Sequence, residues 1–141
     1  AKNNPEPIEI EKQYEYDLGA YFEPLHAEDG TLPIDRHEYY LFSSKEVFKT
    51  PATWNVEVHQ HSTTGLRGPV HFAGFVDNGF IGNLVFEIRS DEVGTITLHD
   101  GMPVSKLQYF KTKKPSFVYG EGIGSHYNKQ DLQVAKYFKK D

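Results

Sequence analysis

Turn signals recur along this chain at intervals of roughly 8–12 residues, and short apolar runs fill the intervals between them. In chain order the turn segments are HAEDGTLP, SSKE, KTPA, TTGLRGP, VDNG, SDEVG, HDGMP, KTKKP and YGEGIG. Intervals this short suit strands better than helices, and their regular spacing is typical of sandwiches, jelly rolls and barrels. The pattern therefore predicts a single all-β domain, a distorted jelly roll or β-barrel.

The two ends of the chain fit this pattern least. Residues 1–13 are polar and contain two prolines, so we expect an arm that becomes ordered only by docking on another segment. The final stretch, NKQDLQVAKYFKKD, is the best candidate for a helix, although Leu132, Val134 and Phe138 fit a final strand equally well. We divide the chain into an N-terminal arm at 1–19 and a main domain at 20–141.

Charge and cysteine content exclude several kinds of function. The formal net charge is −5 at pH 7, which argues against a broad basic surface for nucleic acid but not against a local pocket for a small anion. The absence of cysteine excludes disulfides, thiolate metal sites, cysteine nucleophiles and the zinc-dependent nucleobase deaminases, whose metal needs a P-C-x-x-C segment. No apolar run approaches the roughly 18 residues of a membrane span and no signal peptide is evident, so we expect a cytoplasmic protein without a membrane partner.

One acid stands on a strand that is otherwise apolar. In NLVFEIRS the alternation of a strand places Leu84, Phe86 and Ile88 on one face, and Glu87 on the other face with Val85 and Arg89. Glu87 is either a solvated residue paired with a nearby cation or a partly desolvated acid. Desolvation raises a glutamate pKa toward neutrality, which suits proton transfer, so Glu87 is a candidate catalytic residue, and the strand pattern alone leaves both interpretations open.

The segment HQHSTTGLRG allows three interpretations. His59 and His61 share a strand face and His71 follows, which is compatible with a cupin-like metal site, but the glutamate expected after the second histidine is missing. Alternatively, the hydroxyls, amides and Arg67 of this loop bind phosphate, since anions need convergent donors. It could also be a plain hairpin loop. We predict no protein-bound metal.

Three segments resemble one known superfamily. GFVDNGFIG at 74–82 fits G-x-[IV]-D-x-x-[FY]-x-G, the sugar-binding motif of the dUTPase and dCTP deaminase superfamily. The following NLVFEI resembles the strand that carries the catalytic glutamate in the deaminase branch. YGEGIGSHYNKQ at 119–130 is similar to the end of the C-terminal half of two-domain bacterial dCTP deaminases. The likeness covers residues 20–138.

The resemblance implies a dUTPase-like nucleotide-binding domain that forms a homotrimer with active sites between subunits. It makes Glu87 the general acid and base. The residues that it assigns to nucleotide binding are Asp77 and Phe80 near the deoxyribose, Ser62, Thr63 and Arg67 at the phosphates, and Tyr119, His126 and Gln130 in the closing tail. Two of the family's basic residues are replaced, an arginine by His61 and a lysine by His126.

The implied activity is hydrolytic deamination of dCTP to dUTP and ammonia, with Mg²⁺ bound through the substrate triphosphate. One alternative is dUTP diphosphatase, in which Asp77 would activate water for attack on phosphorus. Another is a nucleotide-binding or assembly domain that has kept the fold and lost turnover. His61 and His126 are the best argument for that last alternative.

Overall fold

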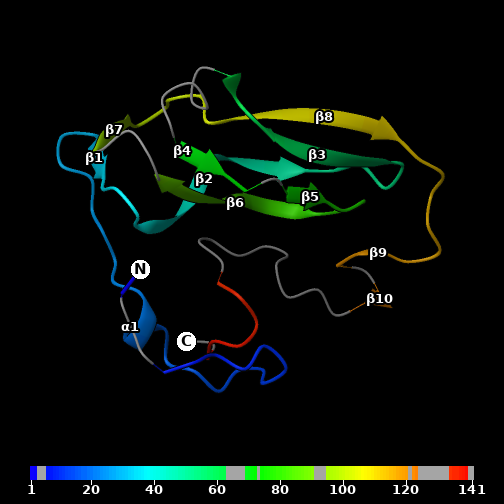
Figure 1. Cartoon of the computed structure of the whole chain (residues 1–141). Helices are drawn as coiled ribbons and strands as arrows, with labels where there is room; N and C mark the ends of the chain where they lie inside the picture. Colours follow the sequence, from blue (N-terminus) through cyan, green and yellow to red (C-terminus); the bar gives the residue numbers. More distant parts are fainter. Residues whose placement is uncertain are drawn as a thin grey trace.

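The computed structural model of the chain describes residues 1–2, 6–62, 69–72, 74–90, 95–120, 122–123 and 134–139. In this part of the chain a short helix, α1 (Leu18–Tyr21), precedes a succession of strands (Figure 1). The strands are β1 (Thr31–Ile34), β2 (Tyr39–Lys49), β3 (Trp54–Gln60), β4 (Pro69–His71), β5 (Gly74–Val76), β6 (Ile81–Ser90), β7 (Ile96–His99), β8 (Ser105–Lys111), β9 (Val118–Tyr119) and β10 (Gly122–Ile123). The expectation of an all-β chain is confirmed. The described residues form no helix that is both long and apolar enough to cross a membrane.

Two three-stranded sheets form the body of the fold. One has the order β2-β6-β4 and the other the order β5-β3-β8, and all neighbouring strands in them are antiparallel. β1 pairs antiparallel with β7, and β9 pairs parallel with β10. The hydrophobic core joins the two sheets, because its buried side chains come from both of them: Tyr40, Leu84, Phe86 and Ile88 from β2 and β6, and Val56, Val58 and Val76 from β3 and β5.

Strand β6 follows the alternation that its sequence predicts. Leu84, Phe86 and Ile88 are buried, whereas Val85 and Glu87 are partly exposed and Arg89 is exposed. A register shift in β2 between Ser43 and Val47 interrupts the pairing with β6. At this shift the buried Ser44 hydroxyl donates to the Glu46 carbonyl at 2.7 Å and accepts from the Leu84 amide at 2.8 Å. The irregularity therefore leaves the Ser44 hydroxyl and the Leu84 amide hydrogen-bonded.

The N-terminal arm docks on the end of the chain. The Tyr14 amide donates to the Lys136 carbonyl at 2.9 Å, and the Lys139 amide donates to the Tyr16 carbonyl at 2.9 Å. Figure 1 shows these two segments together, on one side of the sheets. These bonds involve residues 14–16, which directly follow the segment 1–13 for which the sequence predicts order only on docking. We call residues 14–16 with 136–139 the terminal pairing.

The tail shows no helix at 134–139, where Phe138 instead forms an isolated bridge with Tyr16. Residues 134–139 thus form neither a helix nor a continuous strand, and the rest of the stretch is not among the described residues. Leu132 lies outside the described residues. The division into an arm at 1–19 and a domain at 20–141 stays a prediction.

Candidate active site

Glu87 stands on the face of β6 that points away from the hydrophobic core. Its direct neighbour on β2 is Leu41, and its carbonyl accepts the Phe72 amide at 3.1 Å on the other side. The side chain is half-buried, and burial raises the pKa of its carboxyl group above the ordinary value. No described side chain hydrogen-bonds or forms an ion pair with this carboxylate. The environment is therefore that of a partly desolvated acid, and the catalytic role of Glu87 stays a prediction.

The turn before β6 contains the predicted sugar-contacting residues. The Phe80 amide donates to the Asp77 carbonyl at 3.2 Å, and Gly79 adopts a φ of +86°, which favours glycine. Asn78 fixes the turn, because its side-chain amide donates to the Thr112 hydroxyl at 2.7 Å and to the Ala52 carbonyl at 3.2 Å. Asp77 is exposed at the start of the turn. Its turn position is confirmed, and its contact with a sugar stays a prediction.

The structure brings the tail residue Tyr119 onto this turn. The Tyr119 amide donates to the Asn78 carbonyl at 2.9 Å, and the rings of Tyr119 and Phe80 have centroids 5.9 Å apart. Phe80 is only 7% exposed and packs in the core, so Tyr119 is the more accessible of the two rings. Two motifs that are 39 residues apart in the sequence thus meet at one place, as a shared nucleotide pocket requires.

A cation that the sequence analysis missed lies beside the predicted phosphate-binding hydroxyl. The exposed Lys106 of β8 donates from Nζ to the Ser62 hydroxyl at 3.4 Å. The neighbouring His61 has a buried Nδ1 without a hydrogen-bond partner among the described residues, and its amide donates to the Val104 carbonyl at 3.2 Å. Lys106 reaches Ser62 because of the pairing register of β3 with β8, which places Lys106 opposite His59, three residues before Ser62.

The other predicted contacts cannot be placed. Thr63, Arg67, His126 and Gln130 lie outside the described residues. In the described part of the chain, no three histidine or acidic side chains gather as a metal site would need, and His59 lies 3.2 Å from Glu57 instead. That the protein binds no metal of its own stays a prediction.

Comparison with known families decides what kind of chain this is. The model of the family described as 2'-deoxycytidine 5'-triphosphate deaminase (DCD), C-terminal domain, matches residues 1–138. The chain belongs to this family. The resemblance found in the sequence is thereby confirmed, and the family match includes the arm.

Individual relatives agree with the family. A protein of Persephonella marina named "dCTP deaminase, dUMP-forming" is 28% identical over 113 residues, which are 79% of this chain and 63% of the relative. A Corynebacterium glutamicum protein of the same name is 35% identical over 111 residues, 75% of this chain and 59% of the relative. The family domain described here thus spans between about half and two thirds of the length of the curated relatives it matches.

Solved structures support the fold. The 2'-deoxycytidine 5'-triphosphate deaminase of Agrobacterium tumefaciens matches with a TM-score of 0.65 and 32% identity, over 72% of this chain and 32% of that one. A mutant dUTPase of Staphylococcus bacteriophage 80alpha matches with a TM-score of 0.54 and 14% identity, over 86% of this chain and 91% of that one. The second likeness concerns the fold alone. Together they confirm the prediction of a dUTPase-like jelly roll.

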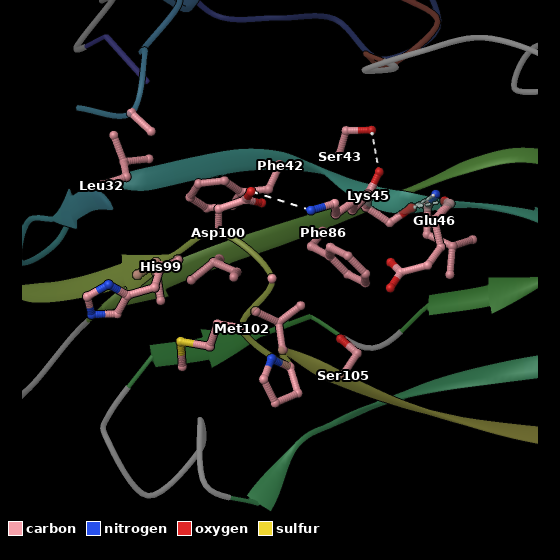
Figure 2. A pocket seen from close by; sticks show the side chains of 18 of the residues that line it. Leu32, Phe42, Ser43, Lys45, Glu46, Phe86, His99, Asp100, Met102 and Ser105 are labelled. Carbon is pink, nitrogen blue, oxygen red and sulfur yellow. Dashed lines mark hydrogen bonds and ion pairs between the residues drawn. The ribbon is translucent and has the colours of Figure 1, made fainter. Parts of the chain in front are cut away.

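A separate cavity of about 840 Å³ lies on the opposite face of the β2–β6 pair of this deaminase-family domain (Figure 2). Its floor includes Phe42, Leu84 and Phe86, and an ion pair of Lys45 with Asp100 at 3.6 Å lies at its edge. None of the predicted site residues within the described part of the chain lines it. Because side chains alternate across a strand, the Glu87 carboxyl is on the other side of the sheet.

Proposed function

We propose that this domain catalyses the hydrolytic deamination of dCTP, with Glu87 as its general acid and base. The observation that carries the proposal is the half-buried carboxyl group of Glu87, with a raised pKa and no described partner. Membership of the dCTP deaminase family supports the choice of substrate. The activity for which the relatives are named is carried over to this chain only as part of the proposal, because the chain spans only part of their length.

The chemistry needs one group that both takes and gives a proton. Water attacks C4 of the cytosine ring, and the Glu87 carboxylate takes the proton that this water loses. The Glu87 carboxyl passes this proton to ring N3 as water adds to C4. It then takes the proton of the new C4 hydroxyl and gives it to the amino group, which leaves as ammonia while the C4 carbonyl forms. A carboxyl whose pKa is raised by burial is a stronger base than an ordinary glutamate and remains acidic enough to donate.

Ser62 and Lys106 are suited to the phosphate end of the substrate. A triphosphate carries several negative charges, and this chain has a net charge of −5, so binding needs local cations. Nζ of Lys106 lies 3.4 Å from Oγ of Ser62. Both groups can donate hydrogen bonds to phosphate oxygens. We infer that Lys106 provides positive charge where the family arginine is replaced by His61. Mg²⁺ would accompany the triphosphate.

Replacing Lys106 by alanine is expected to weaken dCTP binding about tenfold. The loss of binding free energy is at the lower end for a hydrogen bond between charged groups, because the Lys106 ammonium is exposed to water. Titration calorimetry at constant ionic strength measures this change. Lys111→Ala is the matched control, since Lys111 is exposed at the far end of the same strand, opposite Trp54. Equal affinities for wild type and Lys106→Ala would place Lys106 outside the phosphate site.

The assembly and location are also proposals. We propose a cytoplasmic homotrimer in which Thr63 and Arg67 of one subunit and Glu87 of another serve one nucleotide. His126 and Gln130 would close over it. Sedimentation of the purified chain tests this, and a fully active monomer would contradict it.

The product separates two candidate reactions. The curated relatives are named dUMP-forming, which favours a second candidate in which deamination is followed by loss of pyrophosphate. Purified protein is incubated with dCTP or with dUTP in the presence of Mg²⁺, and ammonia, dUTP, dUMP and pyrophosphate are measured separately.

We expect ammonia and dUTP from dCTP in equal amounts. Ammonia with dUMP and pyrophosphate would instead identify the dUMP-forming reaction. Pyrophosphate from dUTP without ammonia from dCTP would identify a dUTP diphosphatase. Nucleotide binding without any product would refute catalysis and identify the chain as a nucleotide-binding domain.

A further inference from the structure

Two aromatic rings, one from each side of β6, meet across the part of β6 that carries Glu87. Tyr39 of β2 is paired with Arg89, and Phe72, directly after β4, bonds to the Glu87 carbonyl through its amide. Their ring centroids are 6.3 Å apart. Strands on either side of a central strand are about 9.5 Å apart, so these rings lean toward each other over β6.

The register places both rings on the face of Glu87. Residues directly opposite each other in an antiparallel pair point to the same side of the sheet, so Tyr39 shares a face with Arg89, and therefore with Glu87. Its neighbour Tyr40 points into the core and is buried. Phe72 contacts the Tyr39 ring and must therefore be on the same side.

The chain ends hold the Tyr39 ring in this position. Phe22, directly after α1, has its ring centroid 6.3 Å from that of Tyr39 and 5.8 Å from that of Phe138. Phe138 is 2% exposed and belongs to the terminal pairing. Tyr137 contacts Phe138 at 4.7 Å between ring centroids. A continuous series of aromatic contacts thus connects the terminal pairing to the sheet face beside Glu87.

Among the described residues, the N-terminal ammonium of Ala1 donates to the Tyr39 carbonyl at 2.7 Å, and three further charged or titratable groups accompany Glu87 here. Arg89 follows on β6 and is exposed, Tyr39 comes from β2, and Tyr137 comes from the tail. Burial, with smaller contributions from Glu87 and Tyr137, raises the pKa of Tyr39 to about 12, so this phenol is neutral at physiological pH. For Glu87 the cause of the raised pKa is burial. Neutral rings that exclude water have this effect on a carboxyl group.

We propose that Tyr39 and Phe72 are positioning residues for Glu87, whose rings meet over β6 and exclude water from one side of its carboxyl group. The rings touch neither the reacting atoms nor the protons and act only through the environment of Glu87. The catalytic consequence rests on the proposed function, whereas the effect on the ionisation of Glu87 does not. Nothing in the sequence indicated this role, because the two residues lie 33 positions apart on strands that only β6 joins.

The direct test is the titration of Glu87 in the resting protein. Glutamate side-chain carboxyl carbons are followed by NMR against pH, and the signal of Glu87 is assigned as the one absent from Glu87→Gln. We expect Tyr39→Ala and Phe72→Ala to lower the Glu87 pKa toward its ordinary value, because water gains access to the carboxylate. Tyr39→Phe keeps the ring and is expected to keep the raised pKa.

The matched control is Phe75→Ala. Phe75 is an exposed aromatic residue three positions after Phe72 but pairs with Glu57 in the other sheet, so its removal is expected to leave the Glu87 titration unchanged. If an alanine variant does not fold, Tyr39→Leu and Phe72→Leu retain apolar bulk while opening the ring contact. An unchanged Glu87 pKa in the folded variants of both positions would overturn the proposal.

Kinetics separates this proposal from the proposed function. If the protein deaminates dCTP, the acidic limb of the pH profile of kcat/KM should move to lower pH in Tyr39→Ala and Phe72→Ala, since that limb reports the base of the free enzyme. If the protein has no deaminase activity, the NMR titration still decides the role of the two rings. If the protein is active but the Glu87 pKa is the same in wild type and in the ring variants, this proposal is refuted and the proposed function is not.

Discussion

Replacing Glu87 by glutamine is expected to lower the turnover of dCTP deamination by about 10²–10⁴-fold, the usual contribution of general acid–base catalysis. The amide has the shape of the carboxyl group but neither accepts the proton of the attacking water nor returns one to the leaving nitrogen. Nucleotide affinity should change little, because the phosphate contacts proposed for Ser62 and Lys106 are untouched. Ammonia release under saturating dCTP and calorimetric binding together measure the two effects.

The pH dependence of stability provides the folding control for this variant. Burial raises the pKa of Glu87 in the folded chain above its unfolded value, so the folded state binds this proton more tightly. The stabilisation that protonation gives is complete below the unfolded pKa and is lost as pH rises through the folded pKa. Glutamine carries no charge at any pH. The melting temperature of Glu87→Gln should therefore exceed that of wild type at pH 8 and approach it in acid.

Two results would contradict this account of Glu87. Near-normal deamination by Glu87→Gln would make Glu87 a solvated strand residue and leave the reaction without a proton-transfer group. A melting temperature well below that of wild type at pH 8 would show that the carboxylate makes a stabilising contact, contrary to its raised pKa.

The architecture around β6 could be predicted because its causes are local. Alternation of Leu84, Phe86 and Ile88 with more polar neighbours sets which face is buried, and that face is buried in the structure. The turn at Asp77 was equally predictable, because Asp, Asn and Gly in succession favour turns. The placement of Glu87 outside the core follows from the same alternation.

Features that depend on pairing between distant segments could not be predicted. Lys106 reaches Ser62 only because β8 pairs with β3 in one register, and a lysine in SKLQYFK carries no signal of its own. Tyr39 and Phe72 meet only because β6 lies between their strands. The packing of the Phe80 ring in the core also depends on distant segments, and the sugar contact that the resemblance implies for Phe80 stays a prediction.

Replacing Gly79 by alanine is expected to destabilise the domain by roughly 3 kcal/mol, from about 1–2 kcal/mol for a non-glycine residue at positive φ and about 1–3 kcal/mol for overpacking. Gly79 has a φ of +86°, and a Cβ atom built there would lie 2.6 Å from Cγ1 of Val118 and 3.3 Å from the Tyr119 carbonyl oxygen. Val118 is β-branched and fixed in β9, so the strand itself must move. That movement would break the bond from the Tyr119 amide to the Asn78 carbonyl.

Gly101→Ala separates the two contributions, because Gly101 has a φ of +74° and a Cβ atom there would have no heavy atom within 4 Å. Urea unfolding of both variants should show a loss for Gly101→Ala of only about 1–2 kcal/mol, the cost of the backbone conformation alone. The difference between the variants then measures the contact of β9 with the turn. Nucleotide affinity should fall for Gly79→Ala and not for Gly101→Ala, since Tyr119 is displaced only in the former. Equal losses of stability with unchanged affinity would mean that Tyr119 and β9 do not pack on the Asp77 turn in solution, and the tail would then have to reach the nucleotide by another route.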